Sequence, residues 1–318
     1  MAIITKEMLE GNKVKGSYIE GVILLQNYTV CLTKNGKYYY NGTLTSGVDI
    51  PFKVWDNSGA YPQLRNNDLS GKVVEIHATW DEYNGVFSLI LNSVKEVKGV
   101  SEANFLPTKY DVDAYFSSLI NMIKNIVSDK AFALADSTLF SNSDIVDAFK
   151  IEFAAKSHHD NCKGGLLAHT YKVCYLTSIV ISTYFGGTLS QDEKDMLILG
   201  ALFHDIGKVK EMHFGQYTDI SVVTHRYLGV EMLDKQAIIE LYGEDWYYYL
   251  ISIMLQHHGE YGDPCKSVVA YIVNQVDMLD ANMTLLEQKL EDSSARELGR
   301  VSMNGSYLEV LKGGKTDA

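Results

Sequence analysis

The segment ALFHDIGKVKE, residues 201–211, decides how the second half of this chain folds. It ends an apolar helical run that Ser190 opens, because Glu193 follows three residues later and completes a capping box. His204 and Asp205 lie in the expected last turn, and a glycine two residues further on stands where the helix should stop. Two ionisable side chains at the end of an apolar stretch predict a buried polar site.

Most histidines of the chain cluster around this segment. Eight of the nine lie between residues 158 and 258, and helical spacing directs several of them to apolar stripes. His169, for example, shares one helical face with Leu166 and Val173. The same periodicity predicts inward-facing side chains at His225, His257, Asp277 and Asp280, with His258 one residue step further round its helix.

A bound metal explains this set better than isolated core histidines do. A single buried histidine is ordinarily paired with a backbone carbonyl, but an unpartnered buried polar group costs about 1–3 kcal/mol. Five helical segments that each accept such a cost indicate a shared cation. Imidazole and carboxylate donors without thiolate suit Mn, Fe, Zn, Ni or Co more than Cu(I) or an iron–sulfur cluster. We expect one or two divalent ions, with Mn first and Co, Fe, Ni, Zn or Mg as alternatives.

The first part of the chain has a different pattern. From Val22 to Val97, short apolar or aromatic runs alternate with turn residues, and the Asn-Gly pairs at 35–36 and 84–85 predict hairpins. We expect a closed five-stranded barrel such as the OB-fold, which commonly binds single-stranded nucleic acid by stacking bases on exposed rings. Most aromatic rings of so small a barrel fill its core. The candidate rings are Tyr38, Tyr40, Phe52, Trp55, Trp80, Tyr83 and Phe87.

These two patterns predict a two-domain protein with separate α and β parts. The segment KGVSEANFLPTKYD, residues 98–111, has the composition of a linker, and helical periodicity dominates from Asp111 onward. We therefore expect an OB-like nucleic-acid-binding barrel over residues 1–105 and an all-α domain over residues 106–318.

Composition narrows the class of protein further. No window of eighteen apolar residues and no signal peptide is present in the sequence, which predicts a cytoplasmic protein without a membrane partner. The four cysteines are widely spaced, so reduced thiols are expected. A net charge of −12 counts against tight duplex binding, because Lys and Arg supply most affinity for nucleic acid.

A series of motifs runs along the chain in a fixed order. The motifs are KVWD (53–56) in the barrel, then SHHDNCKGGLLAHT (157–170), HDIGKVKE (204–211), QYT (216–218), HRYLG (225–229), HHGEYGDP (257–264) and VDMLDAN (276–282). The order H…HD…D in the helical half resembles the HD-domain superfamily of metal-dependent phosphohydrolases. More narrowly, nearly the whole chain is similar to the YhaM family of 3′→5′ exoribonucleases, in which these motifs follow an OB-like barrel.

This resemblance implies a role for each matching residue. In the family pattern a glutamate usually precedes the first ligand histidine and a glycine the middle one, whereas this chain has Ala168 and Thr224. The missing glutamate puts full occupancy of a second metal in question. The implied metal ligands are His169, His204, Asp205 and Asp277, with His225, His257 and His258 added in two-metal members. Asp280 is expected to orient a histidine, Lys208 to hold a phosphate beside the catalytic His204 and Asp205, and Tyr217, Arg226, His158, His159 and Trp55 to contact substrate.

The function expected from these residues is metal-dependent 3′→5′ hydrolysis of single-stranded RNA, or of DNA. The alternative is an HD-domain phosphohydrolase acting on nucleotides, cyclic nucleotides or cyclic dinucleotides, which would use the same metal chemistry. A nucleic-acid-binding or nucleotide-binding protein that has lost catalysis is a third possibility, but such a protein has no reason to keep buried ionisable groups. The sequence leaves homo-oligomer formation open.

Overall fold

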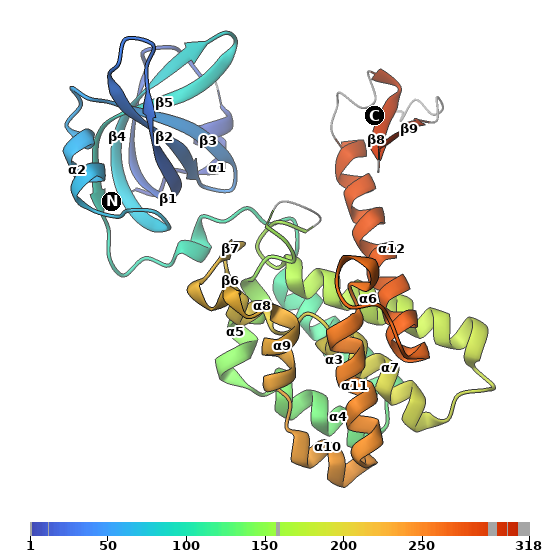
Figure 1. Cartoon of the computed structure of the whole chain (residues 1–318). Coiled ribbons are helices and arrows are strands. Elements are labelled where there is room, and N and C mark those ends of the chain that lie inside the picture. The colour runs from blue at the N-terminus through green and yellow to red at the C-terminus, as the bar shows by residue number, and fades with distance from the viewer. Residues whose placement is uncertain (1, 12, 157–159, 292–297, 304, 311–318) are drawn as a thin grey trace. The chain divides into compact units, whose positions relative to one another are not determined.

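The computed structural model describes residues 2–11, 13–156, 160–291, 298–303 and 305–310 (Figure 1). The chain divides into two compact units, Met1–Thr108 and Lys109–Ala318. None of the helices described is both long and apolar enough to cross a membrane.

The first unit is a closed barrel of five strands in the order β1-β2-β3-β5-β4, which is the order of an OB-fold. Its neighbouring strands are antiparallel, except that β3 and β5 pair in parallel. The strands are β1 (Tyr18–Leu32), β2 (Tyr38–Thr45), β3 (Asp49–Trp55), β4 (Lys72–Tyr83) and β5 (Val86–Glu96), with helices α1 (Lys6–Glu10) and α2 (Ala60–Asn66) and the 3-10 turn η1 (Glu102–Asn104).

Alternation along the strands decides which aromatic rings remain accessible. Phe52 and Trp80 lie in the barrel core, and Tyr40 and Phe87 pack against it. The two Asn-Gly pairs differ from each other. Asn84 and the glycine after it both have positive φ, as a type I′ turn requires, whereas in the first pair only Gly36 does. Of the candidate rings, Tyr38, Trp55 and Tyr83 are exposed.

The second unit is mainly helical. Its helices are α3 (Val112–Ile126), α4 (Asp129–Ala135), α5 (Ser143–Ile151), α6 (Gly165–Val180), α7 (Gln191–Phe203), α8 (Lys208–Glu211), α9 (His225–Glu231), α10 (Lys235–Tyr242), α11 (Glu244–Gln256) and α12 (Val268–Glu291). Short π-helical or 3-10 segments are η2 (Asp136–Phe140), η3 (Ile181–Phe185), η4 (Asp219–Val222) and η5 (Gly259–Tyr261).

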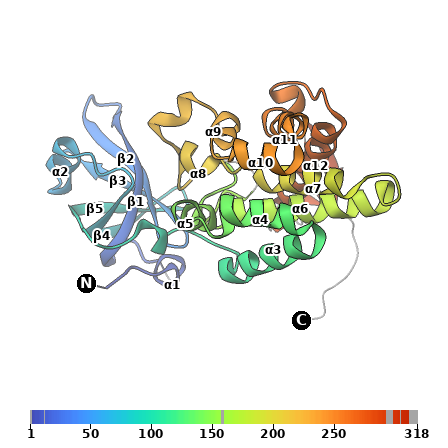
Figure 2. The same cartoon turned by 90° about the horizontal axis from the view of Figure 1, so that it is seen from below.

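Helix α7 forms the centre of this unit. The capping box of Ser190 and Glu193 is present at its start, and its last nine residues are all buried. Helices α4, α6, α11 and α12 contact it, and Figure 2 shows α6 and α7 running side by side beneath α11 and α12. A helix apolar on all sides needs such a cover. The C-terminal end of α7 therefore lies in the interior of the unit.

Two short hairpins interrupt the helical pattern, although the sequence predicted almost no strand here. Strands β6 (Met212–His213) and β7 (Gln216–Tyr217) pair beside α8, and β8 (Arg300–Met303) and β9 (Ser306–Glu309) pair beyond the end of α12 (Figure 1). Phe214 has φ of +51° and Gly215 has φ of +72°, so the first hairpin closes through a tight left-handed turn.

Candidate metal centre

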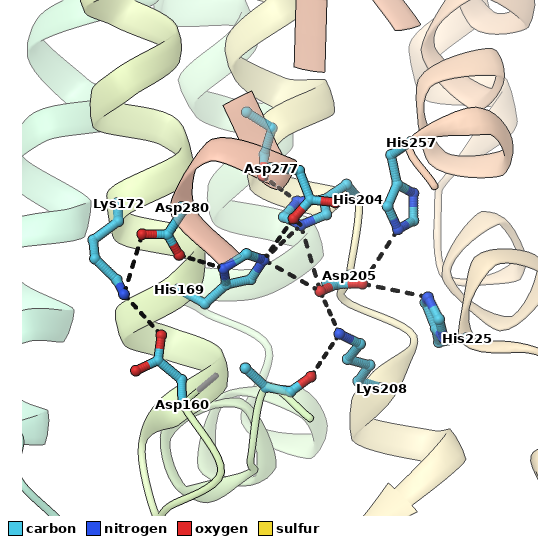
Figure 3. Close-up of polar contacts among 12 residues, drawn as sticks. Asp160, His169, Lys172, His204, Asp205, Lys208, His225, His257, Asp277 and Asp280 are labelled. Carbon is cyan, nitrogen blue, oxygen red and sulfur yellow. Dashed lines mark hydrogen bonds and ion pairs between the residues drawn. The ribbon is translucent and has the colours of Figure 1, made fainter. Parts of the chain in front are cut away.

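The polar centre of the helical unit lies at the end of α7. This helix ends at Phe203, so His204 and Asp205 occupy the turn that follows it rather than its last helical turn. Four further helices direct side chains to the same point (Figure 3). His169 comes from α6, His225 begins α9, His257 and His258 follow α11, and Asp277 and Asp280 come from α12.

The potential ligands fall into two sets of closely spaced atoms. One contains His169, His204 and Asp277; the other contains Asp205, His225, His257 and His258. Asp205 also faces the first set, since its Oδ2 lies 3.5 Å from His169 Nε2 and 3.4 Å from His204 Nε2. Its Oδ1 lies 3.4 Å from Nε2 of both His225 and His257. One carboxylate thus stands between two clusters of imidazoles.

Each of four imidazoles is held by its Nδ1 atom. His204 and His257 place Nδ1 2.7 and 2.8 Å from the backbone oxygens of Ala201 and Met254. A carbonyl can only accept, so these nitrogens carry the proton and Nε2 keeps a lone pair. In the same way, Nδ1 of His169 faces Asp280 at 2.7 Å, and Nδ1 of His225 faces Glu211 at 2.8 Å.

The free atoms of the site fit a cation. Asp205 Oδ1, His225 Nε2 and His257 Nε2 are buried and have no hydrogen-bond partner among the described residues. Nε2 of His169 and Nε2 of His204 lie only 3.2 Å apart. A metal–nitrogen bond of about 2.1 Å places two ligands of one ion about 3 Å apart, so these spacings suit shared coordination. Neutral imidazole and carboxylate are ligands that divalent transition metals accept, and the centre can therefore hold a divalent metal.

The electrostatics of the side chains themselves also favour a cation at this place. Burial alone would lower the pKa of His169, but its hydrogen bonds to Asp277 and Asp280 raise it to about 10. Burial would raise the pKa of the Asp205 carboxyl, yet Lys208 and His204 hold it well below its usual range. The positive charge of protonated His169 thus compensates the negative charge of the neighbouring carboxylates.

In the second set, the surroundings of His257 and His258 lower the pKa of both rings. Burial lowers the pKa of His257, and burial together with the neighbouring His257 lowers the pKa of His258 to about 3. A neutral imidazole is the form that binds a metal. These two rings are therefore ready to act as ligands without losing a proton.

The remaining candidate residues lie in different surroundings. Lys208 Nζ is 2.6 Å from both Asp205 Oδ2 and the backbone oxygen of Ala154, so its ammonium is adjacent to the centre. Arg226 Nη1 is 2.7 Å from the Leu255 oxygen and 3.0 Å from Asp263. Tyr217 on β7 is exposed, with Lys156 over its ring. Trp55 lies on the barrel, in the other unit, and His158 and His159 fall outside the described residues.

Sequence reasoning missed two groups that support the ligands. The buried Glu211 carboxylate accepts both the backbone N–H and the Nδ1–H of His225, at 3.0 and 2.8 Å. Lys172 contacts Asp280, which holds His169. Glu211 belongs to the HDIGKVKE motif and so could have been singled out, whereas no local pattern marks Lys172. Ala168, where the family has a glutamate, is buried and offers no ligand atom.

Comparison with known proteins agrees with this architecture. Residues 166–282 match the HD domain family, so the helical unit contains an HD domain. The chain is also similar to proteins named 3′-5′ exoribonuclease YhaM. It is 26% identical to that of Bacillus velezensis over 87% of this chain and 88% of the relative, and 25% identical to that of Bacillus subtilis over the same shares. The protein of Halalkalibacterium halodurans is 25% identical over 87% of each chain. The resemblance to the YhaM family is thereby confirmed.

Proposed function

We propose that this protein is a metal-dependent 3′→5′ exoribonuclease that hydrolyses phosphodiester bonds of single-stranded RNA. The observation that carries the proposal is the pair of ligand sets that share Asp205. The similarity to exoribonucleases along 87% of the chain gives the substrate class and does not favour the alternative of a small-nucleotide hydrolase.

In this proposal the ligands are His169, His204 and Asp277 for one ion and His225, His257 and His258 for the other, with Asp205 facing both. Nitrogen and oxygen donors accept several divalent transition metals, of which Mn is the one we expect first. Divalent ions in such a site activate water and neutralise charge on a phosphoryl group.

The chain's own residues perform the other tasks. Glu211 and Asp280 accept the Nδ1 protons of His225 and His169, which keeps the opposite nitrogens directed at the centre. Lys208 places an ammonium beside Asp205, where it can stabilise the oxygens of the scissile phosphate. Tyr217 and Arg226 are proposed to contact the terminal nucleotide, together with His159.

The direct test replaces His204 and Asp205 by alanine in the full chain. Metal-stripped protein is incubated with 5′-labelled RNA and DNA oligonucleotides and Mn²⁺, next to a panel of mono- and cyclic nucleotides. We expect a ladder that shortens from the 3′ end of RNA with the unchanged protein and none with the variant. The exposed His213 and Asp245, replaced by alanine in the same unit, serve as the matched control. Full activity in the His204/Asp205 variant would refute the proposal.

We further propose that residues 1–105 form a nucleic-acid-binding domain. Tyr39 and Trp55 are directly paired across β2 and β3, with ring centroids 5.2 Å apart, and Lys53 lies over the exposed ring of Tyr83. Aromatic rings beside an ammonium suit stacking on bases of a single strand. Charge supports this role: Met1–Thr108 carries ten Lys and Arg against eleven Asp and Glu, whereas Lys109–Ala318 carries eighteen against twenty-nine.

This role is tested by replacing Trp55 with alanine and measuring the binding of a labelled RNA strand in EDTA, which prevents hydrolysis. We expect affinity to fall about tenfold, because loss of one stacked base contact costs roughly 1–3 kcal/mol. Tyr18 is another exposed aromatic of the barrel, at a position that pairs with β4, and Tyr18→Ala should bind normally. Equal RNA affinity of the Trp55 and Tyr18 variants would refute the proposal that the surface around Trp55 binds RNA.

A further inference from the structure

A lysine that binds no metal lies between two buried carboxylates behind the metal centre. Lys172 Nζ is 2.8 Å from Asp160 Oδ2 and 3.2 Å from Asp280 Oδ1 (Figure 3). It also lies 2.6 Å from Thr284 Oγ1. The side chains of Asp160 and Asp280 are 0% and 4% exposed. By spacing alone, Asp160, His169 and Asp280 form a third potential metal group, but the ammonium of Lys172 already contacts both of its carboxylates.

The carboxylate of Asp280 is fixed at both of its oxygens. Oδ2 faces Nδ1 of His169 at 2.7 Å, while Oδ1 meets Lys172 and, at 3.4 Å, the hydroxyl of Thr284. Thr284 is one turn further along α12. A carboxylate held by one oxygen can rotate about its own bond, whereas contacts at both oxygens fix its plane. The orientation of His169 therefore depends on Lys172 through Asp280.

Lys172 is itself anchored from the other side. Asp160 accepts a hydrogen bond from the hydroxyl of Tyr110, and its backbone oxygen accepts the N–H of Ala154 at 3.1 Å. A Cβ atom at Gly165 would lie 1.9 Å from that same oxygen, so only glycine fits there. Asp160 has φ of +50°, an uncommon conformation that these contacts hold in place. The anchor is thus built into the backbone at the start of α6.

We propose that Lys172 is a positioning residue for the metal centre. It holds Asp280 so that His169 directs Nε2 at His204, Asp205 and the ion between them. An ammonium has no lone pair and cannot be a ligand, so its effect passes through Asp280 and His169. The expected effect of Lys172 on catalysis rests on the proposed function. Its expected effect on metal binding rests on the geometry alone.

The experiment measures Mn²⁺ affinity by calorimetry on metal-stripped, full-length protein. We use a His225→Ala background, in which the second ligand set is incomplete and the set around His169 dominates. Lys172→Met should weaken Mn²⁺ binding at least about tenfold, as loss of groups that orient ligands commonly does. Lys172→Arg should recover most of the affinity, because a guanidinium can pair with both carboxylates.

Lys150→Met is the matched control. The side chain of Lys150 is 25% exposed, close to the 27% of Lys172. Lys150 also pairs with a carboxylate, that of Asp113, which lies at the surface. Mn²⁺ affinity should be unchanged in this variant. Equal losses in the Lys150 and Lys172 variants would overturn the inference, and so would an unchanged affinity in Lys172→Met.

A second variant separates positioning from the cost of a buried unpaired charge. Lys172→Met leaves Asp160 without its cation, which is expected to lower stability. Adding Asp160→Asn removes that charge and should restore the melting temperature without restoring Mn²⁺ affinity. Recovery of both together would show a structural role only and overturn the proposal.

The catalytic consequence is measured in the otherwise unchanged protein. Lys172→Met should lower kcat for RNA about tenfold while KM stays the same, because the residue contacts no substrate. If the unchanged protein does not hydrolyse RNA but the metal affinities follow the expected order, the proposed function fails and the positioning role stands. A raised KM with normal kcat would contradict the positioning role.

Discussion

Removal of the metal should lower the thermal stability of the helical unit and leave the barrel unaffected. The structure gives the reason, because Asp205 Oδ1 and Nε2 of His225 and His257 are buried without partners among the described residues. An ion bound there satisfies these atoms in the folded chain, whereas the unfolded chain offers no preformed site. The free energy of metal binding therefore adds to the free energy of unfolding.

The size of the effect follows from mass action. A ligand present at about 1,000 times its dissociation constant stabilises the state that binds it by about 4 kcal/mol. For a unit the size of Lys109–Ala318, each kcal/mol shifts the melting temperature by about 2–4 °C. We therefore expect Mn²⁺ at saturation to raise the melting temperature of this unit by about 8–16 °C above its value in EDTA.

Differential scanning calorimetry of the full chain tests this expectation, because the two units of the chain can melt separately. Only the transition of the helical unit should move with Mn²⁺, and His204→Ala with Asp205→Ala should abolish the shift. A melting temperature that is the same in Mn²⁺ and EDTA would refute the assignment of these residues as ligands. A shift that persists in the double variant would place the ion elsewhere.

Three further predictions concern groups that surround the ligands. Glu211→Gln should weaken Mn²⁺ binding about tenfold by calorimetry, since one amide oxygen cannot replace two carboxylate oxygens that hold His225. Gly207→Ala should destabilise the protein by at least about 1–3 kcal/mol in urea unfolding, because its Cβ would lie 2.0 Å from the backbone oxygen of His225. In EDTA, stability should fall below pH 6.5, because burial lowers the folded pKa of His258 to about 3 and the unfolded chain takes up the proton first. Stability should also fall above pH 6.5. Burial alone would lower the pKa of His169, but the neighbouring carboxylates raise it to about 10 in the folded protein. The stabilisation from the His169 proton is therefore lost as the pH rises towards and through that value.

Matched variants make these predictions specific. Glu231→Gln changes a glutamate on the exposed side of α9 and should leave Mn²⁺ affinity unchanged. Gly187→Ala adds a Cβ that meets nothing within 4 Å and should keep stability within about 0.5 kcal/mol. Normal metal affinity in Glu211→Gln, an unaltered unfolding curve in Gly207→Ala, or a flat pH profile would each contradict the corresponding reasoning.

Much of this centre could be predicted because its ligands lie on helices with a strong apolar period. His169 and Asp277 interrupt apolar stripes, and a polar residue on a stripe must point into the core. The barrel was predictable for a similar reason, since strand alternation and Asn-Gly turns repeat at short spacing. In both cases, local periodicity fixes the direction of a side chain before any tertiary contact is known.

What could not be predicted depends on contacts between distant segments. Lys172 and Asp160 are 12 residues apart, but the carboxylate that Lys172 shares with His169 comes from α12, 108 positions beyond Lys172. No periodicity connects such positions. Boundaries were also uncertain: α7 ends at Phe203 rather than at HDIGK, because the chain must turn to bring His204 and Asp205 into the centre.

The distribution of charge resolves the apparent conflict between an acidic chain and a polyanionic substrate. Nearly all of the net charge of −12 lies in the helical unit, where the buried Asp205 and the partly buried Asp277 face imidazoles. Two bound divalent ions would add four positive charges at the position that the scissile phosphate must reach. These charges are present only when the ligands are arranged to hold the ions. The barrel, with almost equal numbers of acidic and basic residues, can contact the strand through stacking, which needs little positive charge. An acidic protein can then act on RNA, provided that its metal is present, and raising the salt concentration should weaken binding less than it would for a lysine-rich RNA-binding protein.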